Sequence, residues 1–116
     1  MKDCEAIDAS AASALPTLSI DLMRVAAIEA TTILRVLANP DRLLLLCQLS
    51  QGERSVGELA AALGIQQPTL SQQLGVLRNE GLVVTRREGK QIYYSVQDGK
   101  LLALLMTLYE LYCPQD

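Results

Sequence analysis

Apolar residues recur at helical spacing along most of the chain, and the pattern predicts five helices and one β-hairpin. The first helix is expected from about Ile20 to Ala38, where aliphatic residues return every three or four positions. Asn39 and Pro40 then supply an N-cap and a proline suited to the first helical position. A second helix is therefore expected to run from there to Gln51 and to stop at Gly52.

Two short helices separated by a tight turn follow. Ser55-Val56-Gly57-Glu58 has the pattern of a capping box, in which the serine accepts from a backbone amide and the glutamate reaches back. The third helix is expected to stop at Gly64, and Gln66-Gln67-Pro68 opens a fourth with leucines at helical spacing. The break between these two helices is therefore expected to span only residues 64 to 66.

The hairpin is predicted from two β-rich segments, Leu82 to Arg87 and Gln91 to Val96. Glu88-Gly89-Lys90 lies between them and is expected to form the turn. If Leu82 begins the first strand, Leu82 and Val84 share one face of the hairpin, because successive side chains of a strand alternate.

The last helix, from about Asp98 to Tyr112, is apolar on almost every side. After Lys100 its only polar residues are Thr107 and Glu110. A helix that is apolar all round must be buried all round. One face can pack on the core of this short chain, and we expect the other to contact a second chain.

Two short helices joined by a glycine turn and followed by a hairpin are typical of a winged helix-turn-helix, in which the second helix enters the major groove of DNA. We therefore expect a mainly α fold with a β-hairpin wing, in the order α-α-α-α-β-β-α. Residues 66 to 79 contain no acid, and their polar side chains are expected to be exposed and able to bond base edges or phosphates. The candidate DNA-binding residues are Gln66, Gln67, Thr69, Ser71, Gln72, Gln73, Arg78, Arg86, Arg87, Lys90 and Gln91. The alternative is that these polar side chains only form the solvent-exposed outer faces of a helical bundle.

The net charge of −3 argues at first against a nucleic-acid partner, since such domains are usually basic. Residues 1 to 21 hold four acids and one base, a net of −3, so the rest of the chain has nine of each sign. Residues 66 to 91 hold four bases and two acids. The chain therefore carries a local basic patch that its net charge conceals.

The chain contains no histidine, which excludes Ser-His-Asp and Cys-His catalysis and any imidazole zinc site. Cys4, Cys47 and Cys113 are too few and too scattered for a disulfide scaffold and are interpreted as cytosolic thiols. Spacing alone favours a buried hydrophobe for Cys47 and an incidental thiol for Cys113. A soft ion held by all three thiolates would require Cys4 to fold back. No enzymatic reaction is indicated.

The longest apolar run, Leu101 to Met106, has six residues, far fewer than the roughly 18 to 20 that span a bilayer. The first residues lack the pattern of a secretory signal. We expect a soluble cytoplasmic protein without membrane contact or cofactor. Residues 1–19 are expected to form a flexible tail, and residues 20–116 a single domain for DNA binding and dimerisation.

Three segments of the chain carry a resemblance to a known family. They are Leu37-Ala38-Asn39-Pro40-Asp41-Arg42-Leu43, Ser55-Val56-Gly57-Glu58-Leu59 and Gln67-Pro68-Thr69-Leu70-Ser71-Gln72-Gln73-Leu74-Gly75-Val76-Leu77-Arg78. Over about residues 25 to 114 the chain resembles the ArsR-type repressors. It is most similar to the BigR and SqrR subgroup of persulfide-sensing regulators, with the HlyU regulators as near relatives.

The resemblance implies a redox-switched repressor. In that subgroup one cysteine lies in the second helix and its partner near the C-terminus, and Cys47 and Cys113 match both places, whereas Cys4 matches none. The implied protein is a homodimer, built through its first and last helices, that binds a pseudo-palindromic operator when reduced. Persulfides or other reactive sulfur species then link Cys47 and Cys113 by a di- or polysulfide and release the DNA.

The chain departs from the family's metal sensors at both of their metal positions. Val56 to Leu63, where those sensors have a cysteine-containing box, has no thiol, and the last helix lacks the expected His and Asp. Gln66 also stands where relatives often have a capping serine. The remaining alternatives are a repressor responsive to arsenite or cadmium and a thiol repressor responsive to peroxide.

Overall fold

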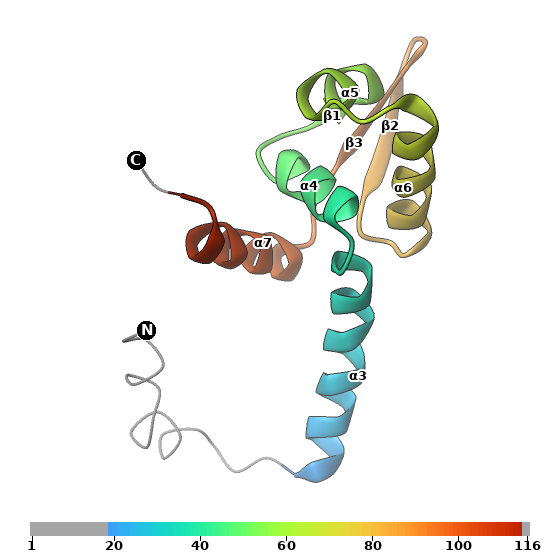
Figure 1. The fold of residues 1–116 in the computed structure, drawn as a ribbon. Coiled ribbons are helices and arrows are strands. Elements are labelled where there is room, and N and C mark those ends of the chain that lie inside the picture. The colour runs from blue at the N-terminus through green and yellow to red at the C-terminus, as the bar shows by residue number, and fades with distance from the viewer. Residues whose placement is uncertain (1–18, 115–116) are drawn as a thin grey trace. The chain divides into compact units, whose positions relative to one another are not determined.

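The structure, a computed structural model, describes residues 19–114 (Figure 1). Within this part, residues 19–32 belong to one compact unit and residues 33–114 to a second. The elements are α3 (Ile20–Leu37), α4 (Pro40–Leu49), β1 (Arg54–Ser55), α5 (Val56–Leu63), α6 (Gln67–Asn79), β2 (Val84–Glu88), β3 (Gln91–Ser95) and α7 (Gly99–Tyr112). The predicted order of helices and hairpin is confirmed, and β1 is an addition. Of the expected tail, residues 1–19, only Ser19 is among the described residues. Cys4 lies outside them.

The first unit is described only as the beginning of α3. Ser19 caps this helix, because its hydroxyl accepts a hydrogen bond from the Leu22 amide at 3.1 Å. Five large apolar side chains of this segment are between 49% and 67% exposed: Ile20, Leu22, Met23, Val25 and Ile28. An apolar surface of this kind on a helix is typical of an interaction face.

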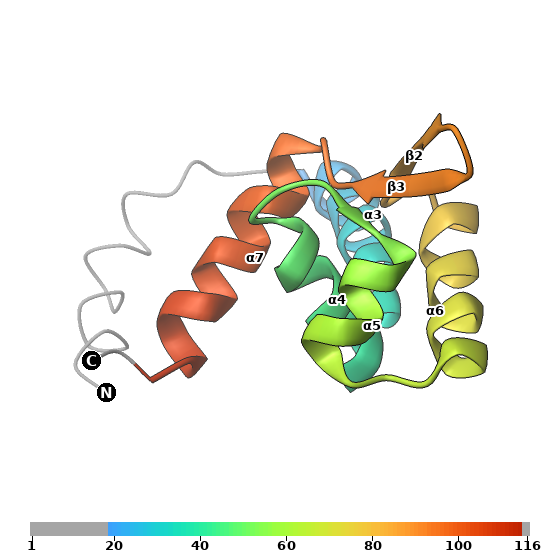
Figure 2. The same cartoon turned by 90° about the horizontal axis from the view of Figure 1, so that it is seen from above.

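The second unit is built around an aliphatic core. The chain has no Phe or Trp, and leucines of α4, α5, α6 and α7 make up most of one core cluster. In Figure 2, α4 lies between α7 and α5. The largest fully buried side chains are Leu45, Leu46, Leu49, Leu59, Leu70, Leu74, Leu77 and Leu105. Val36 and Leu37, at the end of α3, belong to the same core. This core fixes the positions of α4, α5 and α6 with respect to one another.

The helix ends follow the predicted capping signals. The Asn39 side chain accepts from the Arg42 amide at 3.1 Å. Ser55 and Glu58 form the capping box, with distances of 3.2 Å to the serine oxygen and 2.8 Å to the carboxylate. Gly64 ends α5 in the left-handed conformation, with φ of 67°. The turn between α5 and α6 is as short as the sequence predicts.

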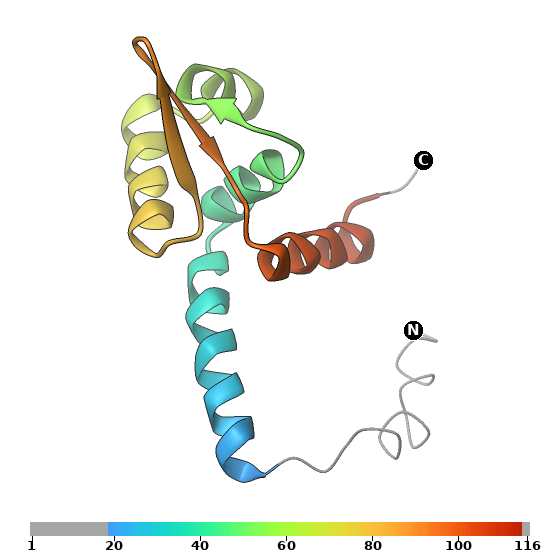
Figure 3. The same cartoon turned by 180° about the vertical axis from the view of Figure 1, so that it is seen from behind.

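The three-stranded sheet has the order β1-β3-β2 with antiparallel pairing. Val84 pairs with Ser95, Glu88 pairs with Gln91, and Arg54 of β1 pairs with Tyr94. Figure 3 shows the long hairpin of β2 and β3 from behind. Sequence patterns do not find β1, because a strand of two residues is too short to show an alternation.

Two expectations about the hairpin are wrong. Glu88 lies in β2 and not in the turn. Leu82 and Val84 do not share a face, because Leu82 lies in the turn after α6, where its amide donates to the Leu77 carbonyl at 3.0 Å. Leu82 and Val83 are both buried while Val84 is 43% exposed, so the strand alternation begins only at Val84.

Some helix boundaries also differ by one or two residues. The second helix ends at Leu49 and not at Gln51, because Ser50 and Gln51 form a turn before Gly52. Asp98 is the N-cap of α7, with its carboxylate accepting from the Lys100 amide at 2.9 Å. In the described part of the chain, each helix is too short or too polar to cross a bilayer.

Candidate nucleic-acid interface and thiol pair

The helix pair α5 and α6 and the β2-β3 hairpin lie next to one another (Figures 1 and 2). Leu70, Leu74 and Leu77 turn one face of α6 into the core, which leaves the opposite face to solvent. The hairpin rises beside α6 and pairs through β3 with the strand that precedes α5. This is the geometry of a helix-turn-helix with a wing, and α6 occupies the place of the recognition helix.

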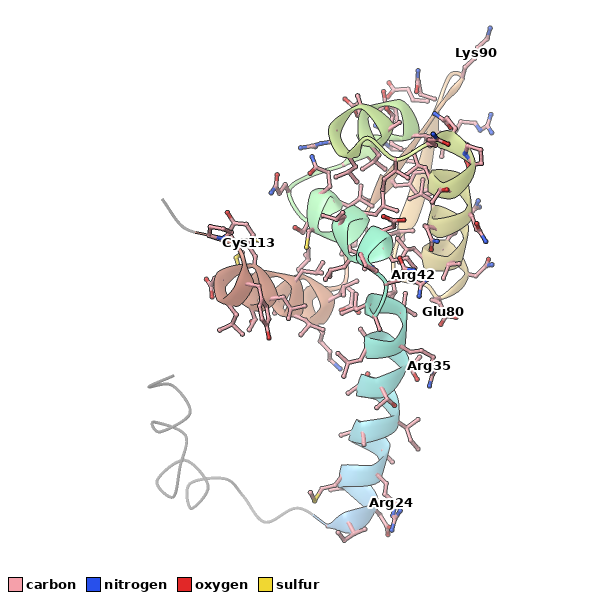
Figure 4. The ribbon with its side chains drawn as sticks, in the orientation of Figure 1. Arg24, Arg35, Arg42, Glu80, Lys90 and Cys113 are labelled. Carbon is pink, nitrogen blue, oxygen red and sulfur yellow. The ribbon has the colours of Figure 1, made fainter. Side chains whose placement is uncertain are left out.

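Most of the candidate DNA-binding residues are exposed in this arrangement. Gln66 to Arg78 and the hairpin contribute the exposed set, which consists of Gln66, Gln67, Ser71, Gln72, Arg78, Arg86, Arg87, Lys90 and Gln91. Lys90 projects from the tip of the hairpin (Figure 4). Thr69 and Gln73, which the sequence predicts to be exposed, are half-buried, because they lie next to the buried Leu70 and Leu74.

The expected basic patch is smaller than the sequence suggests, because Arg86 is already paired. Its guanidinium contacts Glu53 at 2.7 Å and Glu88 at 2.9 Å, and it lies 4.7 Å from the ring centre of Tyr93. The bond from Arg86 is the largest cause that lowers the pKa of Glu53, and the two carboxylates raise the pKa of Arg86. Two opposing charges offset one guanidinium, so Arg86 is a poor phosphate ligand.

Three other basic residues remain available for phosphate. Arg78, Arg87 and Lys90 form no ion pair with a carboxylate within residues 19–114. Arg78 lies in the last turn of α6 and the other two lie on the hairpin. Because α6 itself contains no acid, these three charges make the surface formed by α6 and the hairpin attractive to a polyanion.

Gln73 is bound by a residue to which the sequence patterns assign no role. Arg42, in the first turn of α4, donates from Nη1 to the Gln73 side-chain oxygen at 3.0 Å. A basic residue in the first turn of a helix opposes the helix dipole. This unfavourable position makes Arg42 unusual in the sequence, but only the structure identifies Gln73 as its partner.

The two thiols lie on the helices that the sequence predicts. Cys47 is half-buried in α4, and Cys113 is exposed at the C-cap of α7 (Figure 4). Burial raises the pKa of Cys47, and the negative charge of a Cys113 thiolate raises it further. Cys47 and Cys113 thus belong to α4 and to the end of α7, two helices that contact each other.

A cavity of about 510 Å³ adjoins Cys47 between α4 and α7. Its lining is mostly apolar and consists of Cys47, Ser50, Gln51, Leu102, Leu105, Met106 and Tyr109. A cavity of this size admits a small molecule beside the thiol. Within residues 19–114, no three cysteine, aspartate or glutamate side chains gather as a metal site requires.

Known proteins resemble the chain in sequence and in fold. The sequence pattern of bacterial regulatory proteins of the arsR family matches residues 39–85. A biofilm growth-associated repressor from Agrobacterium fabrum is 54% identical over 90 residues, which cover 78% of this chain and 77% of that repressor.

Two solved structures match as well. The transcriptional repressor BigR from Xylella fastidiosa is 48% identical, with a TM-score of 0.78 over 84% of this chain and all of that one. A homodimeric winged helix-turn-helix DNA-binding domain from Mycobacterium bovis is 31% identical, with a TM-score of 0.67 over 84% of this chain and 89% of that domain. The matched proteins are regulators and not enzymes. Together with the winged helix-turn-helix geometry, these relationships establish that the chain belongs to the ArsR family of bacterial regulatory proteins.

Proposed function

We propose that this chain is a cytoplasmic repressor of transcription that binds operator DNA in its thiol form and is released when Cys47 and Cys113 become linked. The observation that carries the DNA-binding part is the exposed, acid-free face of α6 beside the unpaired Arg87 and Lys90 of the hairpin. Repression is inferred from the similarity to a biofilm growth-associated repressor and to BigR.

In the proposed complex, α6 enters the major groove and the hairpin contacts the backbone. The exposed side chains of Ser71 and Gln72 can bond to base edges, which carry the sequence information. Arg78, Arg87 and Lys90 contact phosphates, which fix the orientation of the protein without reading sequence.

The DNA-binding form is a homodimer in this proposal. Ile20, Leu22, Val25 and Ile28 are exposed on the first part of α3, and Tyr112, at the end of α7, is 79% exposed. Burial of these apolar surfaces against a second copy removes them from water, which favours association. The matched domain from Mycobacterium bovis is homodimeric. A two-fold dimer reads two half-sites about one DNA turn apart, so the operator is pseudo-palindromic.

The exposed Cys113 is the thiol that reacts first with an organic persulfide, because burial disfavours the thiolate of Cys47. The Cys113 thiolate attacks the outer sulfur of the persulfide, forms Cys113–SSH and releases the organic thiol. The Cys47 thiolate then attacks the inner sulfur of this persulfide, Cys113 Sγ, the bond from Sγ to the outer sulfur breaks, and hydrogen sulfide leaves. Two thiols and one persulfide thus give one disulfide, one organic thiol and one hydrogen sulfide. A second persulfide that first converts Cys47 extends the bridge by one sulfur.

The bridge alters DNA binding because it joins α4 to α7. Since α7 also contributes to the proposed dimer, a small displacement of α7 changes the spacing of the two α6 helices. A coupling of about 2 to 3 kcal/mol between the bridge and DNA lowers affinity on the order of 100-fold.

The test uses the full-length protein, DNA duplexes that it selects from a randomised pool, and an organic persulfide. Mass spectrometry measures the bridge and fluorescence anisotropy measures DNA affinity. Wild type and the matched control C4S are expected to form the bridge and lose DNA together, whereas C47S and C113S keep DNA bound. If persulfide leaves Cys47 and Cys113 unlinked and the affinity for DNA unchanged, the proposed sulfur switch is wrong.

Two further inducers separate this proposal from its alternatives. If arsenite or cadmium releases the DNA and persulfide does not, the protein responds to soft metals. If hydrogen peroxide forms the same bridge at an equal rate, the protein is a general thiol sensor. If the wild-type protein selects no duplex, it is not a DNA-binding repressor.

A further inference from the structure

One arginine connects three parts of the second unit. The Arg42 backbone amide donates to the Asn39 side chain at 3.1 Å, its Nε donates to the Val36 carbonyl at 2.7 Å, and its Nη1 donates to the Gln73 side-chain oxygen at 3.0 Å. These contacts join the end of α3, the start of α4 and the middle of α6. Figure 4 shows Arg42 at the start of α4, near the end of α3.

The contact determines which way the Gln73 carboxamide faces. A guanidinium has only donors, so the Gln73 atom that meets Arg42 is the oxygen. The carboxamide is planar, and its NH2 group therefore points away from Arg42. Gln73 is half-buried and so keeps part of its surface open to solvent, and with its oxygen held by Arg42 the NH2 group is the polar group left to bind a ligand.

We propose that Arg42 is a positioning residue for DNA recognition, which holds Gln73 so that it meets DNA only as a hydrogen-bond donor. The inference rests on the proposed DNA binding. It changes the expected role of Gln73, because two-point recognition of adenine requires the carboxamide oxygen as well as the NH2 group. A Gln73 held by Arg42 instead donates to an acceptor on the DNA, either a base atom such as purine N7 or a phosphate oxygen.

Arg42 suits this role because its side chain is itself held in place. Arg42 is half-buried, and its guanidinium forms two bonds from different nitrogens, to Val36 and to Gln73. A lysine has one ammonium group and no planar fork, so it cannot reproduce both contacts with the same geometry. Arg42→Lys therefore keeps the positive charge and loses the positioning.

A double-mutant cycle on the full-length protein tests the inference. The variants are Q73M, R42M and the double variant, with R42K as the charge-preserving variant and Q97M as a control for glutamine replacement at an exposed site outside the helix-turn-helix. Binding is measured on a duplex that the wild-type protein selects from a randomised pool and on an unrelated duplex. Thermal unfolding of each variant is followed by circular dichroism, so that a loss of folded protein is recognised.

We expect Q73M, R42M and R42K each to weaken binding to the selected duplex roughly tenfold, and the double variant to weaken it by the same factor. Q97M leaves binding unchanged. An equal loss on the unrelated duplex identifies a phosphate as the partner of Gln73. A loss of less than about twofold there identifies a base.

Three results overturn the inference. One is a double variant that loses roughly 100-fold, the product of two independent effects. Another is Q73M with unchanged affinity, since Gln73 then does not meet DNA. If the wild-type protein selects no duplex, the proposed DNA binding fails together with the inference. If instead the losses of Q73M and R42M multiply in the double variant, only the inference fails and the proposed DNA binding stands.

A base scan gives a second readout that does not depend on the stability of a variant. At each operator position where Q73M loses base preference, adenine and guanine are exchanged in the duplex bound by the wild-type protein. Both bases present N7 as an acceptor, so a Gln73 that only donates can bond to either. The exchange is then expected to change the affinity by less than about threefold. A roughly tenfold preference for adenine that Q73M abolishes shows two-point recognition and overturns the inference.

Discussion

Arg86 and Glu53 form a two-point salt bridge that ties the hairpin to the segment before β1. The Arg86 Nε donates to one carboxylate oxygen of Glu53 at 3.0 Å and Nη2 donates to the other at 2.7 Å. The third nitrogen of the guanidinium donates to Glu88 at 2.9 Å. The two residues of the bridge are 33 positions apart in the sequence. The bridge offsets the positive charge of Arg86, which the sequence predicts to belong to the basic patch.

This pairing predicts different salt dependences for neighbouring basic residues. The slope of the logarithm of the DNA association constant against the logarithm of salt concentration is expected to become less steep in R87Q and in K90Q, by about 0.9 for every phosphate that the variant no longer neutralises. In R86Q the slope is expected to change much less. The reason is that Arg86 is already compensated by Glu53 and Glu88. Anisotropy titrations of an unrelated duplex at several salt concentrations measure the slopes. A slope for R86Q as flat as that for K90Q shows that DNA displaces the carboxylates.

The same bridge predicts the titration of Glu53. The bond from Arg86 holds the pKa of Glu53 below its ordinary value, so R86Q is expected to raise the Glu53 midpoint in a carboxyl NMR titration. Because the folded-state pKa is lowered, the bridge stabilises the fold above the unfolded-state pKa. That contribution is lost as pH falls below the ordinary range of a glutamate and through the lowered folded-state pKa. R87Q serves as the control, and an unchanged Glu53 midpoint in R86Q contradicts the prediction.

The helices and their ends could be predicted because their causes are local. Asn39, the Ser55-Glu58 box and Gly64 each act within a few residues of themselves, and the structure confirms all three. The resemblance to the family likewise depends on continuous segments, and the comparisons confirm it.

The candidate interface was predicted less completely, because contacts between distant residues decide which polar side chains are available. Gln73 meets Arg42 across 31 positions, and Arg86 meets Glu53 across 33. A sequence pattern counts both residues as polar and cannot show that each has a partner. In the same way, helical spacing places Cys47 in α4 and Cys113 at the end of α7, but it cannot show that these two helices pack against each other.

The order of the proposed sulfur chemistry predicts how the thiols react with iodoacetamide. Burial, and then the charge of Cys113, raise the pKa of Cys47, so its alkylation is expected to have a midpoint above that of an ordinary thiol. In C113S the midpoint moves down, because the like charge is gone. Peptide mass spectrometry across a pH series measures both, with C4S as the control. If Cys47 is alkylated faster than Cys113 at neutral pH, the two cysteines exchange roles in the proposed sequence.

The start of α6 offers a test that separates stability from recognition. Gln66 has the extended backbone of an N-cap, with φ of −68° and ψ of 149°, but its side chain makes no capping bond. In Q66S the hydroxyl can accept from the Thr69 amide, since Pro68 has no N–H, and we expect the fold to be stabilised by about 1 kcal/mol. Thermal melts are expected to rise by roughly 4 to 8 °C, while Q66A stays near wild type.

The same two variants report on DNA, because both remove the Gln66 carboxamide. If Gln66 contacts the operator, Q66S and Q66A lose equal affinity for the selected duplex although only Q66S is more stable. Equal melting temperatures for Q66S and Q66A show that a capping hydroxyl at this position adds nothing. Loss of affinity in Q66A alone shows instead that the order of the first turn of α6, and not the Gln66 side chain, determines binding, since the serine restores that order without the carboxamide.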